Sequence, residues 1–395
     1  MQADEDIRSI LSRTPEHIPA FTPDLGRVAE RARSRRLRKG VGATLAIAAL
    51  VAGIVLPLGL LGGLRPVDEG ERAVPRGRPV ILDRIPVEAG AVDLTVGEGS
   101  VWVTGFNDVS RVDPASDEVV ATIRTPGTGD YSSVAVGEGA VWVTTSKGSL
   151  YRIDPTTNRV EETIQVGYSP TNVTVGGGSV WVSVASAGSG SIVRVDPRTN
   201  EVVGSPIAVG EGPGPAVFVD GSLWVTNTSL IVGEVDKGTE LSGPSLVRVD
   251  PATGMVTPVR GPVASVTAYG AGALWGVAFV RPSSPSTVEG DAVVRLAPDA
   301  NRVTDVIPLD LAQEVAFGEG FVWVLTTPPS TDPTLFIPDP DNPGTVVLID
   351  PATGKPTAEP LPVPGLQPLS IAVGEGSGWV ADYDGSTVTR IGIVP

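Results

Sequence analysis

The sequence predicts an all-β protein: a seven-bladed β-propeller of four-stranded antiparallel blades, preceded by one transmembrane α-helix and a short cytoplasmic tail. Three observations carry this prediction. A phrase of the form "VGEGSVWV" occurs in seven copies, each with one tryptophan, and a second phrase of the form "RVDPAT" follows each copy with variations. An uncharged stretch of 24 residues precedes all of them. A repeat of about 40 residues holding several strands is typical of propeller blades.

The chain divides into four predicted parts. Residues 1–40 form a partly helical cytoplasmic tail, residues 41–64 the membrane span, residues 65–78 a linker and residues 79–395 the propeller. The tail is too short to bury a core of its own. It therefore either docks a partner or serves for membrane topology and attraction to anionic lipid.

Residues 41–64 read "VGATLAIAALVAGIVLPLGLLGGL" and contain no charge. As a helix they would extend about 36 Å, enough to cross a hydrocarbon core of about 30 Å. Seven arginines and lysines lie within residues 26–40, so the positive-inside rule predicts a cytoplasmic N-terminus and an extracytoplasmic propeller at the plasma membrane. The alternative is a cleaved signal peptide, but the apolar run and the segment before it are both long for one.

Composition excludes several classes of function. The chain has 395 residues with 48 glycines, 37 prolines and no cysteine, which suits short strands and tight turns and excludes disulfides and cysteine-based metal sites. Residues 1–64 hold 9 basic and 6 acidic side chains, which leaves 20 basic and 39 acidic ones in the remainder. Such an acidic propeller would repel phosphates, so we expect no nucleic acid partner.

One repeat can be interpreted strand by strand. Residues 132–137 alternate, a Gly-Glu-Gly turn follows, residues 140–145 alternate again, and "SLYRID" and "RVEETIQVG" complete four strands around an Asp-Pro turn. Glycine supplies the positive φ of the first turn, and Asp-Pro is a turn signature in the second. Stacking such sheets around an axis covers both faces of each. All seven tryptophans occupy one position of the repeat, which favours packing between blades: Trp102, Trp142, Trp181, Trp224, Trp275, Trp323 and Trp379.

The last repeat lacks a fourth strand before the end at Pro395. Residues 79–85 match the fourth strands of other repeats, so we expect them to supply the outer strand of the seventh blade. Closing the ring in this way leaves no unpaired sheet at its ends.

The "VGEGSVWV…RVDPxTNxVV" pattern resembles bacterial YVTN/NHL-like β-propeller repeats and, more loosely, the seven-bladed streptogramin lyase family, over residues 79–395. The lyase resemblance implies histidines and a glutamate around the central opening with a divalent ion. The one histidine, His17, lies in the tail, so that chemistry does not carry over. The same observation excludes histidine-dependent nucleophilic catalysis and histidine metal sites in the predicted propeller. The sequence predicts no metal and no cofactor.

Candidate ligand-binding residues lie in loops that share one face of the propeller. Three of these loops are long, in consecutive blades: residues 227–245, 279–291 and 327–344. Insertions side by side on one rim are how repeat proteins build binding surfaces. The polar and aromatic candidates on this face are Asp130, Tyr131, Tyr168, Asn172, Gln313, Glu314, Gln367, Asp382 and Tyr383.

These observations predict a single-pass, membrane-anchored module without catalysis that binds or scaffolds an envelope protein or glycan ligand. A cell-surface hydrolase or lyase that uses carboxylates at the central opening is the alternative. A further alternative is a transmembrane sensor whose tail reports binding outside. Six arginines at one repeat position could bind an anion, but pairing with nearby carboxylates fits them better: Arg111, Arg152, Arg194, Arg248, Arg295 and Arg390.

Overall fold

The computed structural model describes residues 77–395 except 89, 130–131, 187, 228–244, 260–264, 281–289, 328–329, 333–336, 339–342 and 366. The predicted tail, membrane span and most of the linker lie outside these residues, as do most residues of the three long loops. None of the described residues forms a helix that could cross a bilayer.

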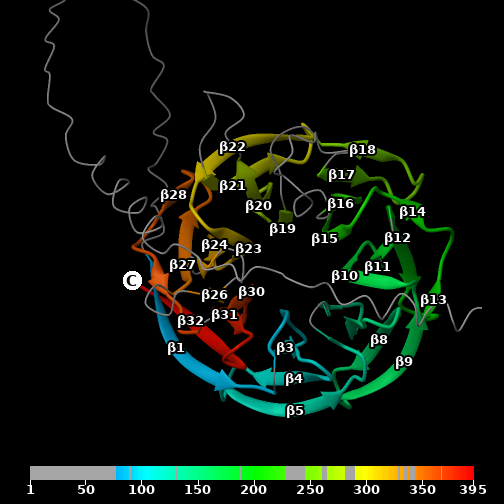
Figure 1. Cartoon of the computed structure of the whole chain (residues 1–395), viewed down its shortest axis with the longest axis horizontal. Coiled ribbons are helices and arrows are strands. Elements are labelled where there is room, and N and C mark those ends of the chain that lie inside the picture. Colours follow the sequence, from blue (N-terminus) through cyan, green and yellow to red (C-terminus); the bar gives the residue numbers. More distant parts are fainter. Residues whose placement is uncertain are drawn as a thin grey trace, which may run out of the picture. The chain divides into compact units, whose positions relative to one another are not determined.

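Seven antiparallel sheets surround a common axis (Figure 1), so the chain is an all-β, seven-bladed propeller. The first four blades are β2–β5 (Leu94–Gly97, Ser100–Thr104, Asp108–Asp113, Glu118–Arg124), β6–β9 (Val134–Gly137, Ala140–Thr144, Ser149–Asp154, Arg159–Gln165), β10–β14 (Ser169–Gly176, Ser179–Ser186, Ser189–Asp196, Glu201–Val202, Ile207–Ala208) and β15–β18 (Pro213–Val219, Ser222–Asn227, Leu246–Val249, Val256–Pro258). In the third blade, β13 and β14 both pair with β12 as one interrupted outer strand.

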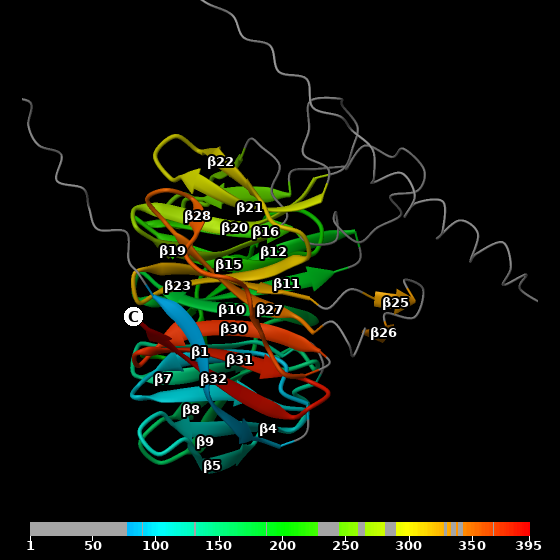
Figure 2. The same ribbon diagram turned by 90° about the vertical axis from the view of Figure 1, so that its left-hand side faces the viewer.

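The fifth blade is β19–β22 (Ser265–Gly270, Ala273–Val280, Gly290–Ala297, Arg302–Pro308). The sixth comprises β23 (Ala312–Gly318), β24 (Phe321–Thr326), β27 (Thr345–Asp350) and the outer pieces β28 (Lys355–Pro356) and β29 (Leu361–Pro362). Between β24 and β27 a small hairpin, β25 (Ser330–Asp332) and β26 (Ile337–Pro338), stands away from the ring (Figure 2). The seventh comprises β30 (Pro368–Gly374), β31 (Ser377–Asp382), β32 (Thr387–Val394) and β1 (Arg78–Pro86).

Strand β1 joins the two ends of the propeller. It pairs antiparallel with β32, from Arg78 opposite Val394 to Pro86 opposite Thr387. Figure 1 shows these two strands side by side at the outer edge of the seventh blade, where the blue and red ends of the chain meet. The seventh sheet therefore has four strands like the others, although its outer strand comes from the start of the propeller.

The repeated Gly-Glu-Gly segment forms the tight turn between the first two strands of a blade. In the first blade Glu98 has φ 52° and Gly99 φ 67°. Two successive positive φ values define the type I′ hairpin turn, whose twist matches that of the flanking strands. The carbonyl of the glycine before the glutamate, Gly97, accepts a hydrogen bond from the indole nitrogen of Trp102 at 3.1 Å. The same bond recurs in six of the seven blades.

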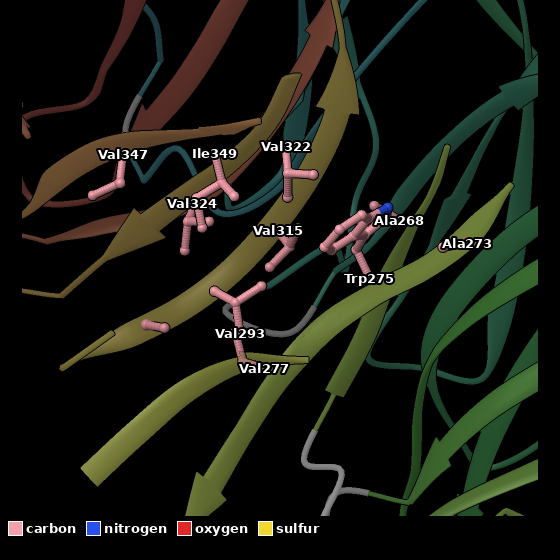
Figure 3. Packing of buried hydrophobic residues seen from close by; sticks show 11 residues of the cluster. Ala268, Ala273, Trp275, Val277, Val293, Val315, Val322, Val324, Val347 and Ile349 are labelled. Atoms are coloured by element: carbon pink, nitrogen blue, oxygen red, sulfur yellow. The ribbon is translucent and has the colours of Figure 1, made fainter. Parts of the chain in front are cut away.

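Each tryptophan is at most 2% exposed, and its ring packs between blades as the sequence predicts. Figure 3 shows this for Trp275 of the fifth blade, which lies against Val315 and Val322 of the sixth. The valines beside the tryptophan on a strand face the opposite way. Val101 and Val103, for example, pack with Trp379 of the preceding blade. The core is therefore a set of seven hydrophobic layers between neighbouring sheets.

The repeated arginines lie over the outer side of these tryptophans. Six guanidinium groups lie 5.0 to 5.8 Å from the centre of the indole of their own blade, a cation–π arrangement. Only three of them have a carboxylate within 4.0 Å among the described residues, namely Arg152, Arg295 and Arg390. The predicted pairing with carboxylates therefore holds for three of the six arginines, and the indole is the partner that all six share.

Candidate functional site

The inner strands of the seven blades surround a cavity of about 620 Å³ at one end of the propeller axis, which we call the mouth. Successive inner strands contact one another around the whole ring, so their first residues converge there. The lining draws on every blade, from Asp93 of the first to Ser370 of the seventh. All seven repeats thus contribute residues to the mouth.

Six blades place a polar side chain at the same level of the mouth. Each of these side chains belongs to the inner-strand residue that lies opposite the second residue after the tryptophan of its blade. They are Asp93, Ser133, Asn172, Ser265, Glu314 and Ser370, which we call the polar layer. The fourth blade has Gly214 and Pro215 there. Strand alternation alone would allow any small side chain at this level. The concentration of acids, hydroxyls and an amide therefore indicates that this level of the mouth is a candidate binding site.

Strand irregularities shape the mouth further. From the third blade to the seventh, each inner strand shifts register at this level, as a β-bulge does. The extra residues, among them Thr171, Thr267 and Gln313, line the mouth. Bulges redirect side chains and are frequent beside functional sites. Here they also connect blades, because Gln313 donates through Nε2 to the carbonyl of Leu369 at 3.1 Å.

A chain of hydrogen bonds links five of the six side chains of the polar layer. Ser370 donates through its hydroxyl to Oδ1 of Asp93 at 3.0 Å, and Ser370 also contacts the carboxyl of Glu314. Asp93 interacts on its other side with Ser133, whose hydroxyl accepts from Nδ2 of Asn172 at 3.1 Å. Five side chains from five consecutive blades are therefore linked.

Both acids are half-buried in the lining of the mouth, and this alters their ionisation. Burial, followed by the nearby charge of Asp93, raises the pKa of Glu314 to about 8. Burial also raises the pKa of Asp93, although hydrogen bonds from Val134 and Ser370 partly oppose the shift. A protonated Glu314 beside an ionised Asp93 is the expected state at neutral pH, because two adjacent carboxylates seldom both ionise.

This assignment predicts how stability depends on pH. Folded Glu314 keeps its proton up to about pH 8, whereas in the unfolded chain a glutamate loses it near pH 4.5. The folded state therefore binds more protons across this window, and stability falls as pH rises through it. Glu314→Gln stays neutral, so its free energy of unfolding should not fall in this way. Relative to the wild type, we expect it to rise by on the order of 2 kcal/mol between pH 5 and pH 8.

Urea midpoints at pH 5 and pH 8 measure this difference. The control is Glu319→Gln, which removes the same charge from an exposed turn of the same blade. Equal pH dependence in the wild type and Glu314→Gln would show that Glu314 is ionised in the folded protein at pH 5.

Three of the candidates that the sequence suggested lie together in the mouth: Asn172, Gln313 and Glu314. Tyr168 precedes the lining residue Ser169 and is 88% exposed, so it stands free at the rim. Asp130 and Tyr131 lie outside the described residues.

The remaining candidates form a separate group in the seventh blade. The backbone nitrogen of Gln367 donates to Oδ1 of Asp382 at 3.0 Å, and that of Tyr383 donates to the carbonyl of Gln367 at 3.0 Å. The ring of Tyr383 meets Phe106 edge-on at 5.7 Å. Asp382 is fully buried and fastens the loop before β30. None of these side chains lines the mouth.

Sequence reasoning missed Asp93, Ser133, Ser265 and Ser370. A signal existed for three of them, because Asp93, Ser133 and Ser370 all stand four residues before the glycine that opens the Gly-Glu-Gly turn. Aligning the seven repeats on that glycine places them with Asn172 and Glu314. Ser265 stands five residues before its glycine because of the bulge, so alignment alone does not find it.

No protein-family model and no curated protein sequence matches the chain. Among solved structures, the chain is similar to a hydrazine synthase chain from Kuenenia stuttgartiensis, with a TM-score of 0.57 over 76% of this chain and 95% of that one, at 15% identity. The likeness is one of fold alone. Because propellers carry many unrelated activities, the function has to be argued from the mouth. The resemblance to YVTN/NHL repeats rests on the repeated phrases and stays a prediction.

Proposed function

We propose that the protein is a binding module whose ligand enters the mouth, without catalysis, and that residues 41–64 hold it at the cell membrane with the propeller outside. The observation that carries the proposal is the polar layer, in which six of seven repeats contribute a hydrogen-bonding side chain to one cavity. The tryptophans already pack the blades against one another, so six polar side chains at one level are more than the packing of the blades requires.

The chemistry of the described lining limits the ligand. It offers hydroxyls, two side-chain amides and two carboxyl groups, and it contains no lysine, arginine or histidine. An anion would meet only like charge there, so the mouth suits a ligand rich in hydrogen-bonding groups that carries no negative charge. A neutral glycan and an organic amine both meet this description.

Occluding the mouth tests the proposal. Ser265→Trp would fill it, whereas Ser116→Trp places the same side chain on an exposed turn of the opposite face. Thermal shifts of the full chain against a panel of envelope glycans, amino alcohols and diamines are the measurement. We expect at least one class to raise Tm in the wild type and Ser116→Trp but not in Ser265→Trp, with near-UV circular dichroism showing that both variants are folded. A panel that shifts all three proteins alike, or none, would contradict binding in the mouth.

The membrane placement has its own test. Protease added to intact cells should digest residues 65–395 while sparing the tail. Protection of the propeller in a protein that fractionates with the membrane would reverse the proposed orientation.

One observation favours a second candidate, a hydrolase or lyase. Glu314 and Asp93 share Ser370, and a protonated carboxyl beside an ionised one is the pairing that acid–base catalysis uses. An enzyme of this kind should lose at least about 100-fold in kcat with Glu314→Gln. A binding module would show no turnover in either form.

A further inference from the structure

The acceptors of the mouth show why its two carboxyl groups are unusual. Inner strands are sheet edges, so the N–H groups that face a neighbouring blade need an acceptor from it. The hydroxyl of Thr226 accepts from Val266 at 3.0 Å between the fourth and fifth blades. That of Thr267 accepts from Val315 at 3.2 Å between the fifth and sixth. A neutral hydroxyl is therefore sufficient for this structural task.

Asp93 and Glu314 perform the same task with a carboxyl group. Oδ2 of Asp93 accepts from the backbone nitrogen of Val134 at 3.0 Å, and Oε2 of Glu314 accepts from Ile371 at 2.9 Å. Burying a charge costs far more than burying a hydroxyl unless a counter-charge is present. No basic side chain occurs in the described lining, and Asp93 and Glu314 are its only titratable groups. The two acids thus exceed what the fold requires.

The direction of the hydrogen bonds shows what is missing. Ser370 has one proton and donates it to Asp93, so towards Glu314 it can only accept. Gln313 is fixed by its Nε2 bond to Leu369, and no described residue donates a hydrogen bond to its buried Oε1. Ser132 is 5% exposed and lines the mouth, and its hydroxyl has no hydrogen-bond partner among the described residues. The lining therefore leaves the Gln313 carbonyl and the Ser132 hydroxyl without a partner among the described residues, and it holds two acids with no positive charge to balance them.

From this we infer that the mouth binds an organic cation, whose primary ammonium group lies between Asp93 and Glu314 and takes the place of the proton on Glu314. The inference rests on the proposed function and specifies its ligand class. An ammonium group has three donors and no acceptor, so it can donate to Asp93, to Glu314 and to one further acceptor of the lining. It also supplies the counter-charge. The proton leaves Glu314 for solvent when the ammonium binds.

Calorimetry of the full chain with 1,4-diaminobutane, and with 1,4-butanediol as the neutral analogue, tests this ligand class. At pH 7 we expect the diamine to bind at least tenfold more tightly than the diol. In buffers of different ionisation enthalpy, binding should release close to one proton per site. Because Glu314 must ionise first, affinity should rise about tenfold per pH unit between pH 6 and pH 7.5. Glu314→Gln should abolish the proton release and weaken binding tenfold or more, and Glu319→Gln should change neither.

The outcomes separate the two proposals. If the diol binds as tightly as the diamine and Ser265→Trp blocks both, the cation inference is wrong and the mouth remains the ligand site. If Glu314→Gln leaves diamine binding unchanged, the cation inference is likewise wrong and the mouth remains the ligand site. If the diamine fails to bind at millimolar concentration while another ligand of the panel is blocked by Ser265→Trp, only the cation inference fails. If no ligand distinguishes Ser265→Trp from the wild type, both are wrong.

Discussion

Trp275→Ala is expected to lower the free energy of unfolding by about 3–5 kcal/mol, because it removes a large side chain from between two rigid sheets. The ring is fully buried and packs against Val315 and Val322 of the next blade (Figure 3). Sheets held by their neighbours on both sides cannot move together to fill the space. Urea unfolding followed by tryptophan fluorescence measures the loss, with six indoles remaining as the probe.

A matched pair of phenylalanine substitutions isolates the indole hydrogen bond. Nε1 of Trp275 donates to the carbonyl of Gly270 at 3.0 Å, whereas Nε1 of Trp224 has no partner among the described residues. Trp275→Phe should therefore cost about 1 kcal/mol more than Trp224→Phe. If Trp275→Ala cost no more than Trp275→Phe, the indole would not be filling the space between blades.

The fold could be predicted because its signals are local and repeated. The turn at Glu98 and Gly99 needs two positive φ values, and the strands on either side of it alternate within a few residues. Seven copies of one such unit leave few alternatives for packing. The structure adds what no local pattern contains, such as the interrupted outer strands of the third and sixth blades.

The mouth could be predicted only in part. The sequence suggests Glu314, Gln313 and Asn172 because they lie in predicted loops between blades on one face, but Asp93 looks like any polar residue of an alternating strand. Its role depends on Ser370, which is 277 residues away in the sequence and adjacent only because the ring closes. The ionisation of Glu314 depends on the same closure. Contacts of this kind arise from the assembled ring, so the sequence of one repeat does not reveal them.

Ile85→Asp in β1 should destabilise the propeller by about 4 kcal/mol or more, because it buries a charge where the ring closes. Ile85 is 2% exposed and packs with Val388 and Trp379. A carboxylate there would detach β1, leave the edge of β32 unpaired and expose the side of the seventh blade. We therefore expect a lower urea midpoint, together with self-association through the free edge, which sedimentation velocity would detect.

The control lies in the same strand. Ile81 pairs with Ile391 but is 36% exposed, so Ile81→Asp should cost only about 1 kcal/mol. The contrast separates closure by β1 from a general sensitivity of this edge to charge. Equal losses of stability at positions 81 and 85 would show that the ring is closed by the backbone pairing of β1 and not by the packing of Ile85. Ile85→Asp could also prove harmless. The propeller would then be stable with six complete blades and one of three strands, and β1 would not be needed to close the ring.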